Sequence, residues 1–283
     1  MNNQDITIII TSFKSEKKII PCLQSIGQNT PILVIENSND LTLKKKLESL
    51  YPNLKCVLSE ENLGYAKGNN LGLSLIKTKY ALIINPDAKL YNNSLERFFV
   101  SASKYPNFAI IGPYIQENDK IIDEKKLDKK MIEVKNVKGF AMFLNLDQFK
   151  DVGYFDDKFF IYFEEIDLCK RLVSNGKKIF LDPTINVFHS GGSSHDEEIN
   201  FEMEKSRNWH WMWSSFYYHK KYSNYFLAFI KMFGKFTKSF IKMIFYTFYY
   251  DQKKKTMYYA RFTGLLNSFI GKKSWYRVKS LFK

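Results

Sequence analysis

The fold of this chain is decided by the stretch Tyr80-Ala81-Leu82-Ile83-Ile84-Asn85-Pro86-Asp87-Ala88. Five apolar residues predict a buried β-strand, and Pro86 ends its hydrogen bonding because proline has no N–H to donate. Asp87 is therefore presented on a turn at the carboxyl end of the strand. A carboxylate at this position is well placed to hold a hard divalent cation on a diphosphate. The common alternative is an Asp that makes a local turn bond.

Short apolar runs recur on both sides of this stretch, about 20 to 25 residues apart, with helix-like sequence between them. They are Ile6–Thr11, Ile32–Ile35, Lys55–Leu58 and Phe108–Ile111, and the intervening helices include Ser15–Gln28, with Ser15 as a candidate cap, and Ala66–Lys77. This alternation predicts an α/β fold with a mostly parallel sheet and helices on both faces. Ligands of such sheets bind beyond the carboxyl ends of the strands. The candidate positions are Thr11-Ser12, Glu36-Asn37, Glu60–Gly64 and Asn85–Asp87.

The order changes after Ile111. We expect a loop, a strand, an aromatic segment, a helix that ends before Gly176, two short strands and a Gly/Ser-rich loop. Their ranges are Lys120–Lys130, Val137–Leu144, Phe155–Phe163, Glu164–Asn175, Ile179–Asp182, Asn186–His189 and Ser190–Ser194. From Phe201 the chain reads as helical, so we expect an α/β domain over residues 1–200 and a helical tail over 201–283.

Three acids, Glu164, Glu165 and Asp167, lie in the first turn of the helix predicted from Glu164. The helix dipole stabilises acids there, which is a structural reason for their presence. Glu165 shares a helix face with the leucines three and seven positions later, whereas Asp167 has the spacing to pair with Arg171. Glu165 is therefore the acid best suited to act as a base, with Glu164 and Asp167 as alternatives.

Two further signals are weak by themselves. His189 follows a strand and precedes a flexible loop, so it is either a surface residue or a neutral imidazole ligand for a metal. The stretch Asn62–Asn70 is a polar, glycine-bearing start of a helix, where backbone N–H groups and Lys67 could meet phosphate. Its glycine spacing fits neither a P-loop nor a dinucleotide fingerprint.

The charge of the chain is concentrated at its C-terminal end. Residues 209–283 hold 15 Lys and Arg, one acid and 25 of the 47 aromatic residues, while the first 208 residues are neutral. The lysines at 231, 235, 238 and 242 share one helix face, with phenylalanines on the rest of the circumference. This tail predicts contact with an anionic membrane surface; packing on the domain over residues 1–200 or between identical chains is the alternative. Nucleic-acid binding is disfavoured, since no nucleic-acid motif occurs.

No uncharged apolar run reaches the ~18 to 20 residues that span a bilayer. No signal peptide is expected at the N-terminus. Cys22, Cys56 and Cys169 are scattered and lack metal spacing, so a disulfide framework is not expected. Together these features predict a cytoplasmic protein, peripheral on the inner face of the plasma membrane.

Taken in order, these pieces resemble the family 2 glycosyltransferases of GT-A fold, in the rhamnosyltransferase-like branch that acts on bacterial surface glycans. The resemblance covers roughly residues 6–193, and its most specific part is Phe155–Leu168 followed by Gly176, Pro183 and His189. It implies transfer of a sugar from a nucleotide diphosphate donor, dTDP-rhamnose or a UDP-sugar, to an acceptor hydroxyl with inversion. A polyprenyl-diphosphate-linked saccharide is the acceptor that the basic tail would suit.

The resemblance also implies roles for single residues. Asp87 and His189 would ligate Mg²⁺ or Mn²⁺, and Glu165 would be the catalytic base. Donor-binding positions are Thr11, Ser12, Glu36, Asn37, Gly64, Lys67, Asn70 and Asn85, and positions near the acceptor are Glu164, Asp167 and Gly139. Asn85 stands where the family has its first metal acid, and Glu165 is one methylene longer than the usual Asp. These departures keep open a GT-A-like module that binds nucleotide or glycan without turnover. A nucleotidyltransferase would need a glycine-rich phosphate loop that is missing here.

Overall fold

The computed structural model describes residues 3–91, 93–116, 130–191 and 194–278. Two compact units make up the chain, and each is described by itself. The first unit holds residues 1–155 and 165–197 and contains the sheet. The second holds residues 156–164 and 198–283 and is helical. The helical unit therefore takes in a short segment from the middle of the sequence.

The N-terminal half of the sheet is parallel. Its strands are β1 (Ile6–Ser12), β2 (Ile32–Glu36), β3 (Leu54–Leu58) and β4 (Tyr80–Ile84), in the order β3-β2-β1-β4. All four strands are those predicted from the apolar runs. Because β1 lies between β2 and β4, the carboxyl ends of all three strands meet at one edge, where ligands bind in open α/β sheets.

The other half of the sheet is mixed. It contains β8 (Ala141–Asn145), antiparallel to β4, followed by β6 (Phe108–Gln116), β9 (Lys178–His189) and β5 (Ala88–Leu90). The short strand β7 (Ile132–Glu133) lies off this order and pairs with β9. β6 and β9 are parallel, whereas β5 and β7 both run antiparallel to β9. The pairing of β5 with β9 matters most for the site, because it joins the turn after β4 to the end of β9.

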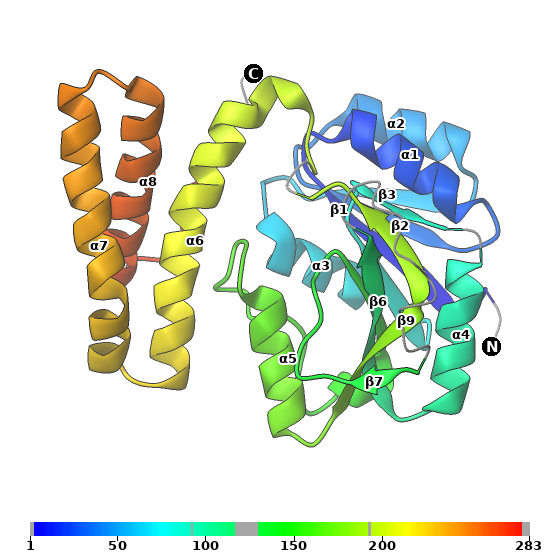
Figure 1. Ribbon diagram of the computed structural model, residues 1–283. Helices are drawn as coiled ribbons and strands as arrows, with labels where there is room; N and C mark the ends of the chain where they lie inside the picture. The colour runs from blue at the N-terminus through cyan, green and yellow to red at the C-terminus, as the bar shows by residue number, and fades with distance from the viewer. Residues whose placement is uncertain (1–2, 92, 117–129, 192–193, 279–283) are drawn as a thin grey trace. The chain divides into compact units, whose positions relative to one another are not determined.

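Helices cover both faces of the sheet, as predicted (Figure 1). They are α1 (Glu16–Ile26), α2 (Leu41–Leu50), α3 (Gly64–Leu75), α4 (Ser94–Lys104) and α5 (Glu164–Ser174). Side chains of a strand alternate between the faces. Ile8 and Ile10 share a core cluster with residues of α1 and α2. Ile9 points the other way, and its Cγ2 would lie only 2.7 Å from a Cβ added at Gly72 of α3.

Three details of the sequence prediction were wrong. The strand predicted over Val137–Leu144 begins at Ala141, because the residues before it form a turn. The two short strands predicted after residue 178 are one strand, β9, in which Pro183 lies in a bulge between Asp182 and Asn186. Proline is tolerated there because a bulge leaves a residue unpaired. The side chain of Ser15 does not cap α1; its Oγ lies 2.7 Å from Oγ of Ser12.

Other expectations have clear outcomes. The helix predicted from Glu164 ends at Ser174, and Gly176 has φ +71°, as its place after the helix requires. The three cysteines are free and buried. The loop predicted over Lys120–Lys130 lies outside the described residues, apart from Lys130.

The helical unit contains α6 (Asn200–Tyr222), α7 (Tyr225–Phe248) and α8 (Gln252–Phe269), which confirms the helical prediction for the tail. The three helices share a core of buried residues: Met212, Phe216, Ala228, Met232, Leu265 and Phe269. Trp209 and Trp213 are buried inside this unit, whereas Trp211 is exposed. Among the described helices, none is both long and apolar enough to cross a membrane.

Candidate functional site

Asp87 is positioned by a turn between two strands. β4 ends at Ile84, and the backbone N–H of Ala88 donates to the carbonyl of Asn85 at 3.0 Å, which closes the turn. Ala88 then starts β5 and pairs with His189 at the end of β9. This register brings Nε2 of His189 to 3.5 Å from Oδ1 of Asp87. The two residues predicted to bind a cation therefore lie side by side.

The carboxylate of Asp87 is buried, yet only half of it is bonded. Oδ1 accepts a hydrogen bond of 2.7 Å from the hydroxyl of Ser194. Oδ2 is also buried but accepts no hydrogen bond from the residues that the structure describes, and Nε2 of His189 likewise has no hydrogen-bond partner among them. Burial by itself would raise the pKa of Asp87, but His189 and Ser194 outweigh it and hold the pKa below its ordinary value. The carboxylate is therefore charged and has an uncommitted oxygen.

A buried, unpaired carboxylate oxygen is costly unless a ligand satisfies it. A divalent cation fits this requirement, because it could take the open Oδ2 of Asp87 and the adjacent imidazole of His189 as ligands. The described residues contain no group of three or more His, Cys, Asp and Glu that could hold a metal. A cation here would therefore take its remaining ligands from water and phosphate oxygens, as Mg²⁺ commonly does.

Gly139 and Phe140, just before β8, connect this pair to the second acid. The N–H of Asn85 donates to the carbonyl of Phe140 at 2.8 Å, and the Phe140 ring stacks on the imidazole of His189 with centroids 4.7 Å apart. The carbonyl of Gly139 accepts a hydrogen bond from the hydroxyl of Tyr65 on α3. A Cβ added at Gly139 would lie 3.5 Å from Cβ of Glu165. Phe140 thus lies beside Asn85 and His189, next to Asp87, and the adjacent Gly139 lies beside Glu165.

Glu165 lies in the first turn of α5 and is partly buried. Burial raises the pKa of its carboxyl above the ordinary value, although backbone N–H groups at this helix end oppose the rise. The leucines three and seven positions later are fully buried, as the spacing predicted. A carboxylate that is partly desolvated in this way is a stronger base than one in water.

The neighbouring acids have different surroundings. Asp167 is fully buried and pairs with Arg171, whose Nε lies 2.8 Å from Oδ2, which confirms the predicted pair. Arg171 also donates to the carbonyl of Val152 at 2.8 Å and to that of Tyr154. This pair holds the loop before residue 155 against α5. Glu164 is buried as well.

The carboxyl ends of β1 and β2 meet the start of α3. Thr11 donates to Oδ1 of Asn69 at 3.1 Å, and Asn37 donates to the carbonyl of Gly64 at 3.0 Å. A Cβ added at Gly68 would lie 2.6 Å from Cγ2 of Thr11, so glycine is required for this close approach. The predicted donor residues Thr11, Asn37 and Gly64 are therefore in one cluster.

Other predicted donor residues have local partners. The buried carboxylate of Glu36 accepts from the backbone N–H groups of Ser38 at 3.0 Å and Asp40 at 2.7 Å, so it shapes the loop after β2. Asn70 forms two hydrogen bonds with the backbone of Phe155, of 2.9 and 3.0 Å. The side chain of Lys67 is exposed in the first turn of α3.

Four residues that complete these clusters were not predicted from the sequence as site residues: Tyr65, Asn69, Phe140 and Ser194. Asn69 and Tyr65 lay within the polar stretch Asn62–Asn70, and Ser194 lay in the predicted Gly/Ser-rich loop. Phe140 lay in the predicted strand Val137–Leu144, but the sequence could not show its stacking partner at the end of another strand.

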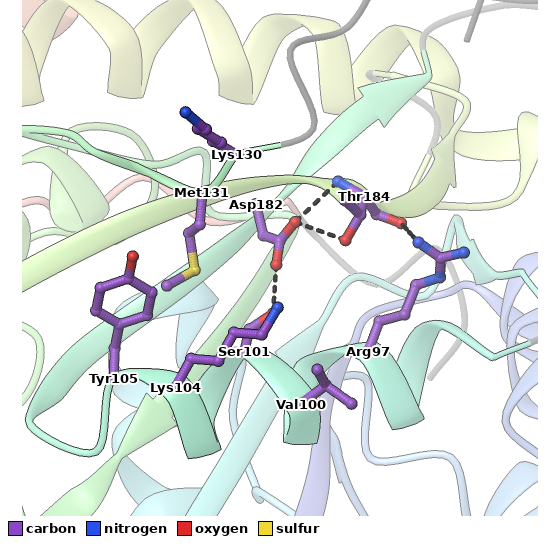
Figure 2. Close-up of a pocket in the computed structure, with 9 residues that line it drawn as sticks. All are labelled: Arg97, Val100, Ser101, Lys104, Tyr105, Lys130, Met131, Asp182 and Thr184. Atoms are coloured by element: carbon purple, nitrogen blue, oxygen red, sulfur yellow. Dashed lines mark hydrogen bonds between the residues drawn. The ribbon is translucent and has the colours of Figure 1, made fainter.

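A separate cavity of about 450 Å³ lies between α4 and β9 (Figure 2). Figure 2 shows Asp182 at its centre, bonded to Ser101 and to both N and Oγ1 of Thr184, while Arg97 reaches the Thr184 carbonyl at 2.9 Å. Both oxygens of the Asp182 carboxylate thus already accept hydrogen bonds from the protein. No residue predicted for the site lines this cavity, and the clusters described above do not involve it.

Comparison with known proteins shows which proteins this chain is similar to. The family model Glycosyl transferase family 2 matches residues 7–169. The low-salt glycan biosynthesis hexosyltransferase Agl10 of Haloferax volcanii is 23% identical over 209 residues, which cover 66% of this chain and 67% of that protein. Rhamnosyltransferase WbbL of Escherichia coli is 26% identical over 239 residues, or 72% and 88% of the two chains. The N-acetylglucosaminyl-diphospho-decaprenol L-rhamnosyltransferase of Mycobacterium tuberculosis is 21% identical over 211 residues, or 58% and 68%.

Solved structures share the fold. Mannosyltransferase PcManGT from Pyrobaculum calidifontis, in complex with GDP-Man and Mn²⁺, matches with a TM-score of 0.60 and 11% identity over 95% of this chain and 88% of that one. GalNAc-T7 with UDP, GalNAc and Mn²⁺ matches with a TM-score of 0.56 and 15% identity. In that case the match covers 65% of this chain but only 43% of GalNAc-T7. At these identities the likeness concerns the fold alone.

Proposed function

The chain belongs to glycosyl transferase family 2 and has the GT-A fold, and on this premise we propose that it transfers a sugar from a nucleotide diphosphate donor to a hydroxyl of a saccharide acceptor, with inversion. Asp87 and His189 bind the divalent cation, Mg²⁺ or Mn²⁺, and Glu165 is the base. Thr11, Asn37 and the start of α3 bind the nucleotide end of the donor.

One observation carries the proposal. The buried Oδ2 of Asp87 accepts no hydrogen bond from the described residues, and Nε2 of His189 lies 3.5 Å from the other oxygen, Oδ1. Asn85 in place of a first metal acid leaves the protein with two ligands, so the diphosphate of the donor would complete the coordination. When bound, the cation would neutralise the charge that builds on the leaving diphosphate.

The residues divide the chemistry between them. The Glu165 carboxylate takes the proton of the acceptor hydroxyl while that oxygen forms its bond to the anomeric carbon. The bond from this carbon to the β-phosphate oxygen breaks at the same time, and the nucleoside diphosphate leaves with the electron pair. Attack from the face opposite the leaving group inverts the anomeric centre. Burial of Glu165 favours this step, since a raised pKa makes the carboxylate a stronger base.

The relatives suggest the substrates. Two of them are named as rhamnosyltransferases, and one of these names describes a decaprenol-diphosphate-linked acceptor. We therefore expect dTDP-rhamnose or a UDP-sugar as donor and a lipid-linked saccharide as acceptor, in the synthesis of a surface polysaccharide. A place on the inner face of the plasma membrane agrees with such an acceptor and stays a prediction.

The test separates binding from turnover. Thermal shifts with dTDP, UDP and GDP, with and without Mn²⁺, identify the nucleotide, and release of free nucleoside diphosphate measures turnover. Asp87→Ala should abolish the Mn²⁺-dependent part of the shift. Glu165→Gln should keep that shift and lose turnover. The exposed Glu61→Gln serves as a matched control and should change neither.

Two results would contradict the proposal. If no nucleotide stabilised the protein with or without Mn²⁺, the donor site would be refuted. If nucleotide bound but the wild type released no more diphosphate than Glu165→Gln, the alternative of a non-catalytic binding module would replace it. Asn85 and Glu165 differ from the residues that the family usually has at these two positions. These differences favour the non-catalytic alternative.

A further inference from the structure

Helix α7 exposes an unusual amount of apolar surface. Only part of its circumference faces α6 and α8, through Ala228, Met232 and Ser239, which are buried. The opposite side carries large apolar side chains in water: Phe226 is 69% exposed and Ile241 63%. Soluble proteins rarely expose contiguous apolar patches of this kind unless the patch binds something.

These side chains form one strip along the helix. Residues three, four or eight positions apart share a face of an α-helix, and six of the exposed residues follow these spacings. We call them the apolar strip: Phe226, Ile230, Phe233, Ile241, Ile244 and Phe248. Phe229 and Phe236, which lie between these positions in sequence, pack instead on the core of the helical unit.

A row of lysines runs beside the apolar strip. Lys231, Lys235 and Lys238 are exposed, and Lys242 is half-buried, with its Nζ 5.1 Å from the centre of the Tyr258 ring. Their spacings of four, three and four residues keep them on one side of α7, between the apolar strip and the buried side. The sequence of α7 contains no acid, so nothing on the helix neutralises them.

The end of α7 continues the same chemistry. Phe248, Tyr249 and Tyr250 are 76%, 70% and 86% exposed, and three lysines, Lys253–Lys255, follow at the start of α8. Tyr side chains combine an apolar ring with a polar tip, which suits the boundary between headgroups and acyl chains. Basic residues beside them suit the headgroup phosphates.

We propose that α7 docks in the plane of an anionic lipid bilayer. The apolar strip enters the boundary between headgroups and acyl chains, and Lys231, Lys235 and Lys238 contact lipid phosphates. This geometry is that of an interfacial amphipathic helix, which lies on a membrane rather than across it. The inference goes beyond glycosyl transfer and does not depend on it, because vesicle binding needs neither donor nor acceptor.

Charge favours a membrane over a second copy of the chain as the occupant. Two copies joined through their apolar strips would bring two lysine rows to the edges of one interface. With no acid on α7, the row of either copy would lack partners on the other helix, and like charges repel. An anionic surface satisfies the lysines and the apolar strip together.

The experiment measures partitioning of the full chain onto vesicles of phosphatidylcholine with and without phosphatidylglycerol. The double variant Ile230→Ser, Ile241→Ser removes apolar contact, and we expect it to weaken partitioning on the order of a hundredfold. The matched control, Leu50→Ser with Leu75→Ser, changes two leucines of the other unit that are 49% and 50% exposed. It should stay within about twofold of the wild type.

A second pair of variants tests the charges. Replacing Lys231, Lys235 and Lys238 by Gln should weaken binding to anionic vesicles about fivefold for each lysine and leave binding to neutral vesicles unchanged. The control replaces three exposed lysines of the first unit, Lys45, Lys55 and Lys77, by Gln and should have little effect. High salt should abolish the difference between the lysine variant and the wild type.

A direct readout of contact does not depend on affinity. The variant Ile241→Trp should gain fluorescence that brominated lipids quench, whereas Leu75→Trp should not. Absence of quenching, or equal vesicle binding by the apolar variant and its control, would overturn the proposal. A wild-type dimer in light scattering that the apolar variant converts to a monomer, without any change in vesicle binding, would overturn it in favour of a second copy.

Discussion

Glu165 lies at the start of a helix and is partly buried. These two conditions shift the pKa of its carboxyl in opposite directions. Backbone N–H groups favour the carboxylate, while desolvation favours the neutral acid and prevails, so the pKa is raised. The two residues before the acid pair, Tyr162 and Phe163, have φ of +72° and +71°. Bulky residues seldom adopt this left-handed conformation, and it costs of order 1–3 kcal/mol each. Such strain is a feature of functional sites.

Glu165→Gln should lower kcat by about 10²- to 10⁴-fold, the usual contribution of a general base. Glu165→Asp keeps the charge but shortens the reach, and a shift of about 1 Å can cost about 10²-fold. Steady-state kinetics of diphosphate release measure both. Equal rates for the wild type and Glu165→Gln would remove Glu165 from the role of base.

The pH profile supplies a second check on the same residue. A base works only when deprotonated, so kcat/KM should fall as the pH decreases through the pKa of Glu165. Because burial raises that pKa, the midpoint of the acidic limb should lie above the ordinary value of 4.5. A limb at or below that value would show that Glu165 is not the group that titrates.

His210 is a fully buried histidine whose two ring nitrogens both have hydrogen-bond partners. Its Nε2 lies 2.9 Å from the carbonyl of Tyr276, and its Nδ1 lies 3.0 Å from the hydroxyl of Ser274. A carbonyl can only accept, so Nε2 carries the hydrogen and Nδ1 accepts from Ser274. Burial lowers the pKa of His210 to about 3, and the nearby Arg277 acts in the same direction.

A depressed histidine pKa makes the folded state less stable in acid. The unfolded chain gains a proton below about pH 6.5, whereas the folded chain remains neutral until about pH 3. Stability is therefore complete above pH 6.5 and decreases as the pH falls, by about 2 kcal/mol at pH 5. Denaturant unfolding of wild type and His210→Gln between pH 7 and 5 measures this loss, and the variant should lack it. Parallel pH dependences would show that His210 is protonated when folded.

At the scale of elements, close backbone contact joins α6 and α8. A Cβ added at Gly264 of α8 would lie 2.3 Å from the backbone carbonyl oxygen of Trp209 on α6. Backbone atoms cannot move aside as a flexible side chain can. Gly264 is therefore required for the spacing of these two helices. Gly234 of α7 has no atom within 4 Å of the same position.

These two glycines form a matched pair for a stability experiment. Gly264→Ala should lower the free energy of unfolding by about 1–3 kcal/mol or more, because the helices must separate. Gly234→Ala should raise it by up to about 1 kcal/mol, because alanine favours a helix without any new contact. Chemical denaturation monitored by circular dichroism measures both. The same sign for both variants would contradict the packing of α6 on α8.

At the scale of the molecule, the helical unit is built from two separate parts of the sequence. The segment 156–164 packs on α6: Phe159 on Tyr217 with ring centroids 4.9 Å apart, and Phe160 on His210 at 4.4 Å. Ser214 donates to the carbonyl of Ile161 at 3.0 Å. A boundary drawn near residue 200 therefore separates these aromatic side chains from their partners.

A chain truncated after residue 197 should expose Phe159 and Phe160, which are 0% and 7% exposed in the complete chain. Exposed aromatic rings bind hydrophobic dyes and promote aggregation. We expect the truncated chain to aggregate and to bind such a dye, and the additional changes Phe159→Ser and Phe160→Ser to reduce both effects. A soluble truncated chain with a sharp thermal transition would show that the first unit does not need the helical one.

The sequence alone determined the features that depend on near neighbours. Apolar runs placed β1 to β4, because a strand buried on both faces needs continuous apolar sequence. Pro86 placed Asp87 on a turn, and helical spacing predicted both the Asp167–Arg171 pair and the burial of the leucines beside Glu165. The basic, aromatic tail was evident as helical, and its lysines as one face of a helix.

Only the tertiary structure decided what meets across long separations. Asp87 faces His189 because β5 pairs with β9 in one register, and no local pattern encodes the register of strands about 100 residues apart. The membership of segment 156–164 in the helical unit, and the division of the α7 phenylalanines into buried and exposed, are also of this kind. Periodicity states which residues share a face, but burial depends on what packs against that face.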